Sequence, residues 1–402
     1  MSISAMGQSA HRLVMERKPH PPQTVIMLAL GLGQTIAFAS SFYLMGVLGD
    51  DMAADLALPP TFVFSLMSVA LAASAVAAPA AGRWIDRHGG KAPLLISNLV
   101  FAAGLGLIGL AKGPVLLTLG MIGLGLAMAL GLYGTPFAIL VSLYGGQARR
   151  AITGVALIGG LGSSLGFPAT HWLGQQFGWQ GACFAWAGAH LLICLPLGAL
   201  VIPRDLGGHM SADDGPPAPV VWDRRMIQLS VLFAGAWFIS TCMSTHLPRL
   251  LVAFGLSTAV AMSTAALVGV AAVAVRALEF AVLRRFPPLM ATRAATLMHP
   301  LGAAALLTFG KAAAPALALG QGAGNGMLTV AKGVLPLSIW GTEGYAYRSA
   351  VLGRPAQIAQ IGGPALYGLA LDRSPTLALI AGAALCLVMF AMTFGLNKEL
   401  SA

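Results

Sequence analysis

The sequence predicts an all-α integral membrane protein with twelve transmembrane helices, arranged as two halves of six. Three observations lead to this fold class. The 402 residues are 57% apolar and only 9% charged, whereas about 25% of the residues in a soluble domain are charged. Twelve apolar segments are long enough to cross a bilayer, which takes about 20 residues per helix. A long polar stretch separates the sixth segment from the seventh.

The apolar segments follow one another with short polar turns between most of them. In the first half we expect helices over 24–48, 60–82, 92–111, 114–143, 151–173 and 180–202. In the second half we expect them over 226–248, 257–282, 288–310, 313–339, 349–370 and 375–396. This gives a tail over 1–23, a six-helix bundle over 24–202, a linker over 203–225, a second bundle over 226–396 and a tail over 397–402. The linker is rich in proline and acidic residues, which is typical of an exposed segment.

Lysine and arginine residues in the short turns predict the orientation of the chain. With the N-terminus in the cytoplasm, the residues on the opposite face are Lys112, Arg249, Lys311 and Arg373. Three more, Arg276, Lys332 and Arg354, lie within apolar segments, and the remaining sixteen of the 23 fall on the cytoplasmic face. We therefore expect a multi-pass protein of a bacterial inner membrane with both termini in the cytoplasm.

Composition and motifs argue against several other classes of protein. The net charge of +10 is spread over short clusters between apolar segments, without the alternation of basic and aromatic residues found in single-strand binders, so no nucleic-acid partner is expected. The sequence lacks a zinc-protease motif, a serine elbow and a phosphate-binding glycine loop, which indicates neither an enzyme nor ATP-driven transport by this chain. The four cysteines lie in apolar segments without metal-ligand spacing. We predict no cofactor and no metal.

The most distinctive motif is the run from Gly82 to Lys91, which reads GRWIDRHGGK. We expect it to form a ten-residue polar turn that joins the second and third helices as an antiparallel hairpin. Its order of Gly82, the pair Asp86 and Arg87, Gly89 and Lys91 resembles the loop signature of the major facilitator superfamily. The helix number and the central linker extend the resemblance over essentially the whole chain.

The resemblance implies two six-helix bundles, related by a pseudo-two-fold axis, around a cavity that opens alternately to each side of the membrane. It also implies that Asp86 and Arg87 contact neighbouring helix ends in the outward-facing state, where a helix N-terminus suits the charge of Asp86. Glu279 is the counterpart of Asp86 in the second half, although Val275 stands where the family pattern has glycine. The alternative is that the cations of the loop only set the topology.

Two departures from family patterns bear on the kind of transporter. The fourth helix lacks the arginine that is often found in proton-coupled members. In the fifth helix, Phe167 separates Gly166 from Pro168, which breaks the glycine-proline pair of drug-proton antiporters. Multidrug export is therefore disfavoured, and a carrier similar to the monocarboxylate branch of the family is the first hypothesis.

The tenth helix, which lines the cavity in this family, carries the strongest candidate for a substrate site. Lys332 lies well inside the segment, where an ionisable side chain costs about 2.5–3.5 kcal/mol on insertion scales. Gln321 and Asn325 share its helix face, since their spacing places all three within about 40° of one another. Arg354 on the eleventh helix is expected at a similar depth, so the two cations predict a site for a small anion, with Gln357 as a hydrogen-bond donor. The alternative is that Arg354 extends to the interface and Lys332 binds a backbone carbonyl.

Other lining helices supply further candidates. Gln34 on the first helix and Tyr133 on the fourth are polar residues within apolar segments. Every Asp and Glu falls in a turn or near a helix end, so a carboxylate relay for protons has no obvious carrier. His246, which closes the seventh helix on the outer side, is the proton-coupling candidate because histidine titrates near neutral pH. The alternatives are a structural histidine and a proton carried by the substrate itself.

The resemblance and these candidate residues predict a secondary transporter that moves a small organic anion across the inner membrane. Its partners are this solute, the lipid bilayer and, as a candidate coupling ion, the proton, and we expect a monomer. An efflux carrier for a metabolite or toxic compound is the alternative. A non-transporting receptor on the same scaffold is a more remote one.

Overall fold

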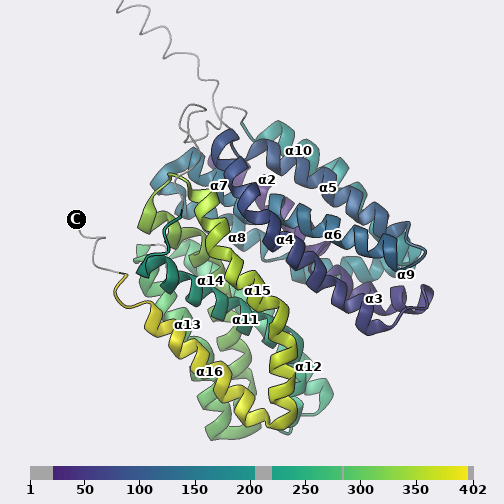
Figure 1. Ribbon diagram of the computed structural model, residues 1–402. Helices are drawn as coiled ribbons and strands as arrows, with labels where there is room; N and C mark the ends of the chain where they lie inside the picture. Colours follow the sequence, from purple (N-terminus) through teal and green to yellow (C-terminus); the bar gives the residue numbers. More distant parts are fainter. Residues whose placement is uncertain (1–20, 204–219, 283–284, 397–402) are drawn as a thin grey trace, which may run out of the picture.

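The computed structural model describes residues 21–203, 220–282 and 285–396. Within these ranges all the regular secondary structure is helical, as the sequence predicts (Figure 1). The predicted N-terminal tail up to residue 20, the linker from 204 to 219 and the C-terminal tail from 397 lie outside the described residues.

In the first half of the chain, several membrane crossings are divided into shorter helices. The first crossing consists of α2 (Gln23–Ala39) and α3 (Leu44–Asp55), the second of α4 (Pro60–His88) and the third of α5 (Lys91–Gly109). The fourth consists of α6 (Pro114–Gly131) and α7 (Gly134–Tyr144), which the 3-10 turn η1 (Gly145–Ala148) follows. The fifth and sixth consist of α8 (Arg149–Gly159), α9 (Gly162–Ala189), the π-helix η2 (His190–Cys194) and α10 (Leu195–Val201).

The turn between the fifth and sixth crossings lies inside the range of α9. Gly178 has a φ of 70°, a left-handed conformation that glycine adopts without a steric cost. The indole nitrogen of Trp186 donates a hydrogen bond of 3.1 Å to the hydroxyl of Thr170, so residues on both sides of Gly178 lie against each other. The chain therefore reverses at this glycine, inside the interval that the sequence left between 173 and 180.

In the second half, each crossing is one helix. The helices are α11 (Arg224–Ala253), α12 (Thr258–Ala281), α13 (Pro288–Phe309), α14 (Ala314–Trp340), α15 (Tyr345–Arg373) and α16 (Pro375–Met392), with the 3-10 turn η4 (Gly310–Ala313) before α14. By length and composition alone, eight apolar helical stretches could cross a membrane. Three of them hold parts of two crossings each: Pro114–Gly159, Pro168–Val201 and Pro288–Trp340. Two crossings lie outside these stretches: the first, formed by α2 and α3, and the eleventh, formed by α15. Together the described helices form the twelve crossings that the sequence predicts.

The polar run over 82–91 is not the ten-residue turn that we expected. The second helix continues to His88, and only Gly89 and Gly90 separate α4 from α5. Gly89, at a φ of 80°, ends α4. The prediction was wrong because an apolar window ends where polar residues begin, whereas a helix continues past the bilayer as long as its backbone hydrogen bonds are made.

Side chains of α2 donate hydrogen bonds at two of the helix breaks, which the sequence did not predict. The amide of Gln34 donates to the carbonyl of Gly131, at the end of α6, over 2.8 Å. The hydroxyl of Thr35 donates to the carbonyl of Ile158, near the end of α8, also over 2.8 Å. The carbonyl of Ile158 also accepts from the backbone N–H of Leu161 at 2.9 Å. A carbonyl group left without a partner inside a membrane costs several kcal/mol, so the bond from Gln34 to Gly131 makes the break after α6 tolerable.

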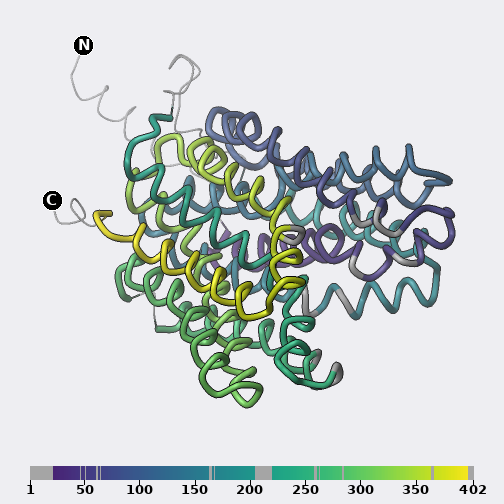
Figure 2. Tube along the Cα trace, turned by 60° about the horizontal axis from the view of Figure 1, so that its bottom comes forward, coloured from purple at the N-terminus to yellow at the C-terminus, as the bar shows by residue number. Residues whose placement is uncertain are grey.

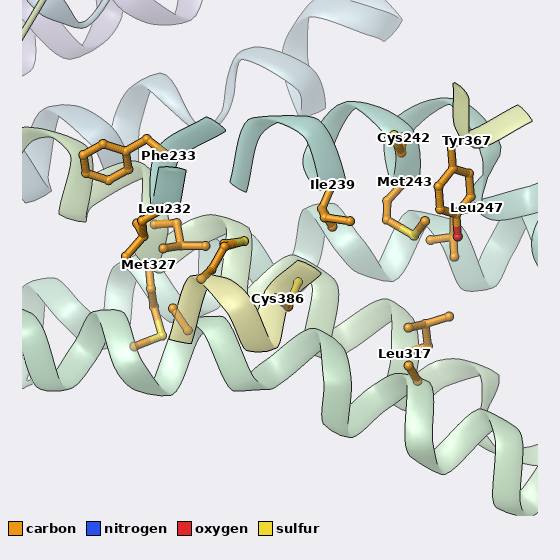
Figure 3. Close-up of a cluster of buried hydrophobic side chains, with 14 of the residues drawn as sticks. Leu232, Phe233, Ile239, Cys242, Met243, Leu247, Leu317, Met327, Tyr367 and Cys386 are labelled. Carbon is orange, nitrogen blue, oxygen red and sulfur yellow. The ribbon is translucent and has the colours of Figure 1, made fainter. Parts of the chain in front are cut away.

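Hydrophobic side chains pack within each half and also between the halves. One buried cluster draws on residues 226–396, and Figure 3 shows part of it, including Phe233, Met327 and Cys386. A second cluster draws on residues 37–187. A third combines both halves, with Phe137 and Val334 among its members. The boundaries predicted for the two bundles, 24–202 and 226–396, stay a prediction.

The two halves meet at one end of the molecule and diverge toward the other (Figures 1 and 2). The end at which they meet carries α7, α8 and the beginning of α15. It also carries residues 82–91, and we call it the motif end. The diverging parts lead to α3 in the first half and to the start of α12 in the second.

Candidate functional site

Asp86 connects the two halves at the motif end. It lies near the end of α4, and its carboxylate accepts hydrogen bonds from the backbone N–H groups of Ala346 (3.0 Å) and Tyr347 (2.7 Å) in the first turn of α15. The first N–H groups of a helix have no partner within the helix, and the positive end of the helix dipole favours a negative charge. A single side chain of the first half thus caps a helix of the second half.

The same approach of α4 to α15 requires a glycine at position 82. A Cβ atom on Gly82 would lie 2.8 Å from both the carbonyl oxygen of Ala346 and the Cα atom of Tyr347. Neighbouring Arg83 places its guanidinium over the ring of Tyr347, 5.2 Å from the ring centroid, a cation–π distance. The two halves therefore meet here with their backbones in contact.

The other motif residues act within the first half. The amine of Lys91 donates to the carbonyl oxygens of Ala199 (2.7 Å) and Ile202 (2.5 Å), where α10 ends. A cation is favourable at a helix C-terminus because it complements the dipole. Gly89 ends α4, and the side chain of Arg87 is exposed. Gly82, Arg83 and Asp86 thus contact the other half, whereas Lys91 binds within its own half.

Glu279, the predicted counterpart of Asp86, is buried near the end of α12, with 3% of its surface exposed. Its Oε2 atom has no hydrogen-bond partner among the described residues. Arg149 of the first half and Arg276 of α12 are the cations whose charges act on it. In place of a helix N-terminus, Glu279 therefore faces two guanidinium groups.

Lys332 is half-buried on α14, and its amine faces an aromatic ring. The distance from Nζ to the centroid of the Trp237 ring on α11 is 5.0 Å. On the other side, a Cβ atom built on Gly353 of α15 would lie 3.9 Å from the same nitrogen. The amine thus lies between α11 and α15, with space beside it that a larger residue at 353 would fill. Among the described residues, no carboxylate lies within ion-pair distance of it.

The polar stripe expected on α14 does not act as one surface. Gln321 is 5% exposed and shares a hydrogen bond of 2.7 Å with the ring of His299 on α13, inside the second half. Asn325 is half-buried. Helical spacing predicted one common face for these residues and Lys332, but Gln321 contacts α13 and Lys332 contacts α11. Gln321 is therefore a partner of His299 in the interior.

Arg354 does not lie beside Lys332. Position 353 faces the amine, since a Cβ atom built there would lie 3.9 Å from Nζ, and the next residue on a helix points about 100° away. Arg354 is exposed, as is Ile358 one turn further along α15. Gln357, in contrast, faces the first half, where its amide nitrogen approaches the hydroxyl of Ser74 on α4 at 3.2 Å. The joint site of two cations is not assembled in this state.

Gln34 and Tyr133 both lie at the break between α6 and α7. The amide of Gln34 is occupied by the Gly131 carbonyl and the side chain is 2% exposed. The ring of Tyr133 stacks on Phe137 with centroids 5.1 Å apart, and its hydroxyl lies 3.4 Å from the carbonyl of Ala156. Tyr133 also lies within the field of Arg276 from the other half, so it is near the surface that the halves share.

His246 lies toward the far end of α11 and contacts α15. Its ring stacks on Tyr367 with centroids 6.0 Å apart, and a Cβ atom on Gly368 would lie 3.3 Å from the ring. The histidine is therefore packed between two helices of the second half. Its role in proton coupling stays a prediction.

The sequence reasoning missed Trp237 and the placement of Arg276. A tryptophan in the middle of the seventh segment was a usable signal for Trp237, because that helix was expected to line the cavity. Arg276 was recognised as a cation within a span, but its neighbour on α8 could not be inferred. Contacts between helices depend on their rotation about their own axes, which helices that are apolar all round specify weakly.

Comparisons with known proteins agree with the fold. Residues 30–353 match the family model described as Major Facilitator Superfamily. The structure is similar to that of the human organic anion transporter MFSD10 (TETRAN), with a TM-score of 0.72 and 14% identity over 93% of this chain and 100% of that one. It is also similar to the E. coli fucose:proton symporter FucP, with a TM-score of 0.71 and 14% identity over 94% and 98% of the two chains.

The proton:xylose symporter XylE is a third similar structure, with a TM-score of 0.65 and 12% identity over 92% of this chain and 93% of that one. Identities this low show a common fold and nothing finer. No curated protein sequence matches the chain significantly.

Proposed function

The chain belongs to the major facilitator superfamily, and from this premise we propose that it is a secondary transporter that moves a small organic anion by alternating access. Secondary transport of a small solute follows from the family and its fold. The anionic character of the solute is the part that we infer from the residues of this chain.

The observation that carries the proposal is the unpaired amine of Lys332. Inside a membrane, charged side chains pair with one another, bind backbone carbonyls or line a pathway for substrate. The nearest features of Lys332 are the face of Trp237 at 5.0 Å and Gly353, whose missing side chain leaves space beside the nitrogen. Neither neutralises an ammonium group. A carboxylate or another small anion would supply the missing charge, with Trp237 packing against its apolar part.

The closed motif end supports alternating access. We infer from the distribution of lysine and arginine that the motif end faces the cytoplasm of a bacterial inner membrane. With this orientation the described state is outward-facing, because Asp86 and Gly82 hold α4 against α15 on the inner side. Binding of the anion at Lys332 is then expected from the outer side.

The experiment is a thermal-unfolding screen of the protein in detergent against small carboxylates, inorganic oxyanions and lipophilic cations. A ligand that binds only the folded state at 100 times its Kd raises stability by about 2.7 kcal/mol. We expect a carboxylate to raise the Tm of the wild type and to have no such effect on Lys332→Gln. Lys332→Arg keeps the charge and should keep part of the effect.

Arg354→Gln is the matched control, since it removes one exposed cation from the neighbouring helix. It should retain the full stabilisation by the carboxylate. Stabilisation by lipophilic cations alone would refute the anion proposal and favour the efflux carrier. Loss of stabilisation in both variants would show that overall charge is responsible, and it would remove Lys332 from the site.

A further inference from the structure

The fifth crossing is interrupted where it meets the other half of the molecule. The first helix of this crossing, α8, ends at Gly159, and α9 begins at Gly162. The N–H of Gly160 bonds back to the carbonyl of Ala156 at 3.0 Å, and the carbonyl of Ile158 accepts from the N–H of Leu161 and from Thr35. The C-terminal end of a helix carries a partial negative charge. The break therefore places a negative helix end inside the membrane-spanning part of the first half.

Arg276, from α12 of the second half, lies directly against this helix end. A Cβ atom built on Gly160 would lie 2.3 Å from Nη1 of Arg276, so the guanidinium occupies the space that any other residue would need. The side chain is 7% exposed. Its Nη2 donates to the hydroxyl of Thr329 on α14 at 3.2 Å. Thr329 belongs to the same half as Arg276, whereas Gly160 belongs to the other.

Glu279 lies three residues further along α12, which brings two side chains of a helix close together. It is 3% exposed, and its Oε2 has no hydrogen-bond partner among the described residues. Arg276 and Arg149 both act on it electrostatically, and the guanidinium of Arg276 donates its hydrogen bond to Thr329. A buried carboxylate oxygen without a hydrogen bond is costly, so in this state Oε2 of Glu279 is an unsatisfied acceptor close to Arg276.

We propose that Arg276 exchanges partners during the transport cycle, binding the C-terminal end of α8 when the motif end is closed and Glu279 when it is open. Opening separates α12 from α8, because these helices belong to different halves. Arg276 then loses Gly160 and the helix end, keeps Thr329, and finds the carboxylate of its own helix. In the described state the guanidinium has its hydrogen bond to Thr329, while its Nε has no partner among the described residues. A carboxylate that replaces the helix end as its neighbour lowers the cost of opening. Arg276 is a positioning residue in this scheme, distinct from Lys332.

The test is a double-mutant cycle on the ratio of closed to open states, measured without substrate. Spin labels at His88, at the end of α4, and Met290, in the first turn of α13, report on the motif end, because both side chains are exposed and lie in different halves. The four buried cysteines are replaced beforehand. The variants are Arg276→Gln, Glu279→Gln and the double substitution.

We expect Glu279→Gln to favour the closed state about tenfold more strongly when Arg276 is present than in the Arg276→Gln background, a usual size for the coupling of contacting residues. The comparison between backgrounds cancels the attraction between Glu279 and Arg149, which both backgrounds share. The proposal would be overturned if Glu279→Gln changed the ratio equally in both backgrounds. It would also be overturned if Glu279→Gln favoured the closed state less strongly when Arg276 is present. Arg354→Gln is the control background, in which Glu279→Gln should act as it does in the wild type.

Gly160→Ala gives a second measurement that keeps both charges, and it serves if Arg276→Gln does not fold. The added methyl group displaces the guanidinium of Arg276 from the end of α8, so the ratio of open to closed states should rise severalfold. The gain should shrink when Glu279→Gln is added. An unchanged ratio in Gly160→Ala would contradict the exchange. The proposal rests on alternating access and not on the nature of the solute, so a failed carboxylate screen leaves this test intact.

Discussion

Replacement of Asp86 by asparagine removes a charge from the contact between α4 and α15 and keeps the size of the side chain. The carboxylate accepts two backbone hydrogen bonds, at 2.7 and 3.0 Å. Hydrogen bonds to charged groups contribute about 1.5–3 kcal/mol each, and a negative charge at a helix N-terminus adds about 0.3–1 kcal/mol. Asparagine retains one oxygen for one of the two N–H groups. We therefore expect the closed state of the motif end to lose about 2 kcal/mol relative to the open one.

A loss of this size shifts the ratio of closed to open states roughly 30-fold, since each 1.4 kcal/mol is a factor of ten. Spin-label distances across the motif end measure this ratio directly. Transport by Asp86→Asn should slow, with an unchanged preference among substrates, because Asp86 binds the first turn of α15 at the motif end, whereas Lys332 faces Trp237 of α11. An altered substrate range would argue against a gating role.

Asp55→Asn is the matched control. Asp55 also accepts two hydrogen bonds, from the side chains of Trp179 (3.0 Å) and Gln180 (2.9 Å), but both partners belong to its own half of the chain. Its substitution should lower thermal stability and leave the ratio of states unchanged. If Asp86→Asn shifts the ratio no more than Asp55→Asn does, the reasoning about Asp86 is refuted.

Three further substitutions test other contacts. Gly82→Ala places a methyl group 2.8 Å from Ala346, so it should favour the open motif end in the same spin-label measurement, and an unchanged ratio would contradict the close approach. Lys91→Met removes two bonds to α10 and should lower the Tm without a change in the ratio. Gln34→Leu leaves the Gly131 carbonyl unpaired and should destabilise the protein by about 1–3 kcal/mol; an unchanged Tm would show that the carbonyl finds another partner.

The candidate site shows how far sequence reasoning reaches in a membrane protein. Lys332 stood out because a cation inside an apolar segment is costly, and that argument needs no structure. Its pairing with Arg354 was inferred from depth alone. Depth follows from counting residues along a helix, but direction depends on how α15 is rotated, and the structure turns Gly353 toward Lys332 and leaves Arg354 exposed. For the same reason we expected Gln321 to share a polar stripe with Lys332 on α14, whereas the structure pairs it with His299.

The sequence by itself determined the number of crossings, the long polar stretch between the halves and the motif over 82–91. It could do so because the thickness of the bilayer dictates about 20 apolar residues for each helix. Only the tertiary structure decided where helices break, since a break is tolerated where the freed carbonyl groups find partners, as the carbonyl of Gly131 does in Gln34 of α2. The structure also decided that Asp86 meets α15 and Arg276 meets α8, because contacts between residues far apart in the chain depend on how twelve similar apolar helices are rotated and tilted against one another.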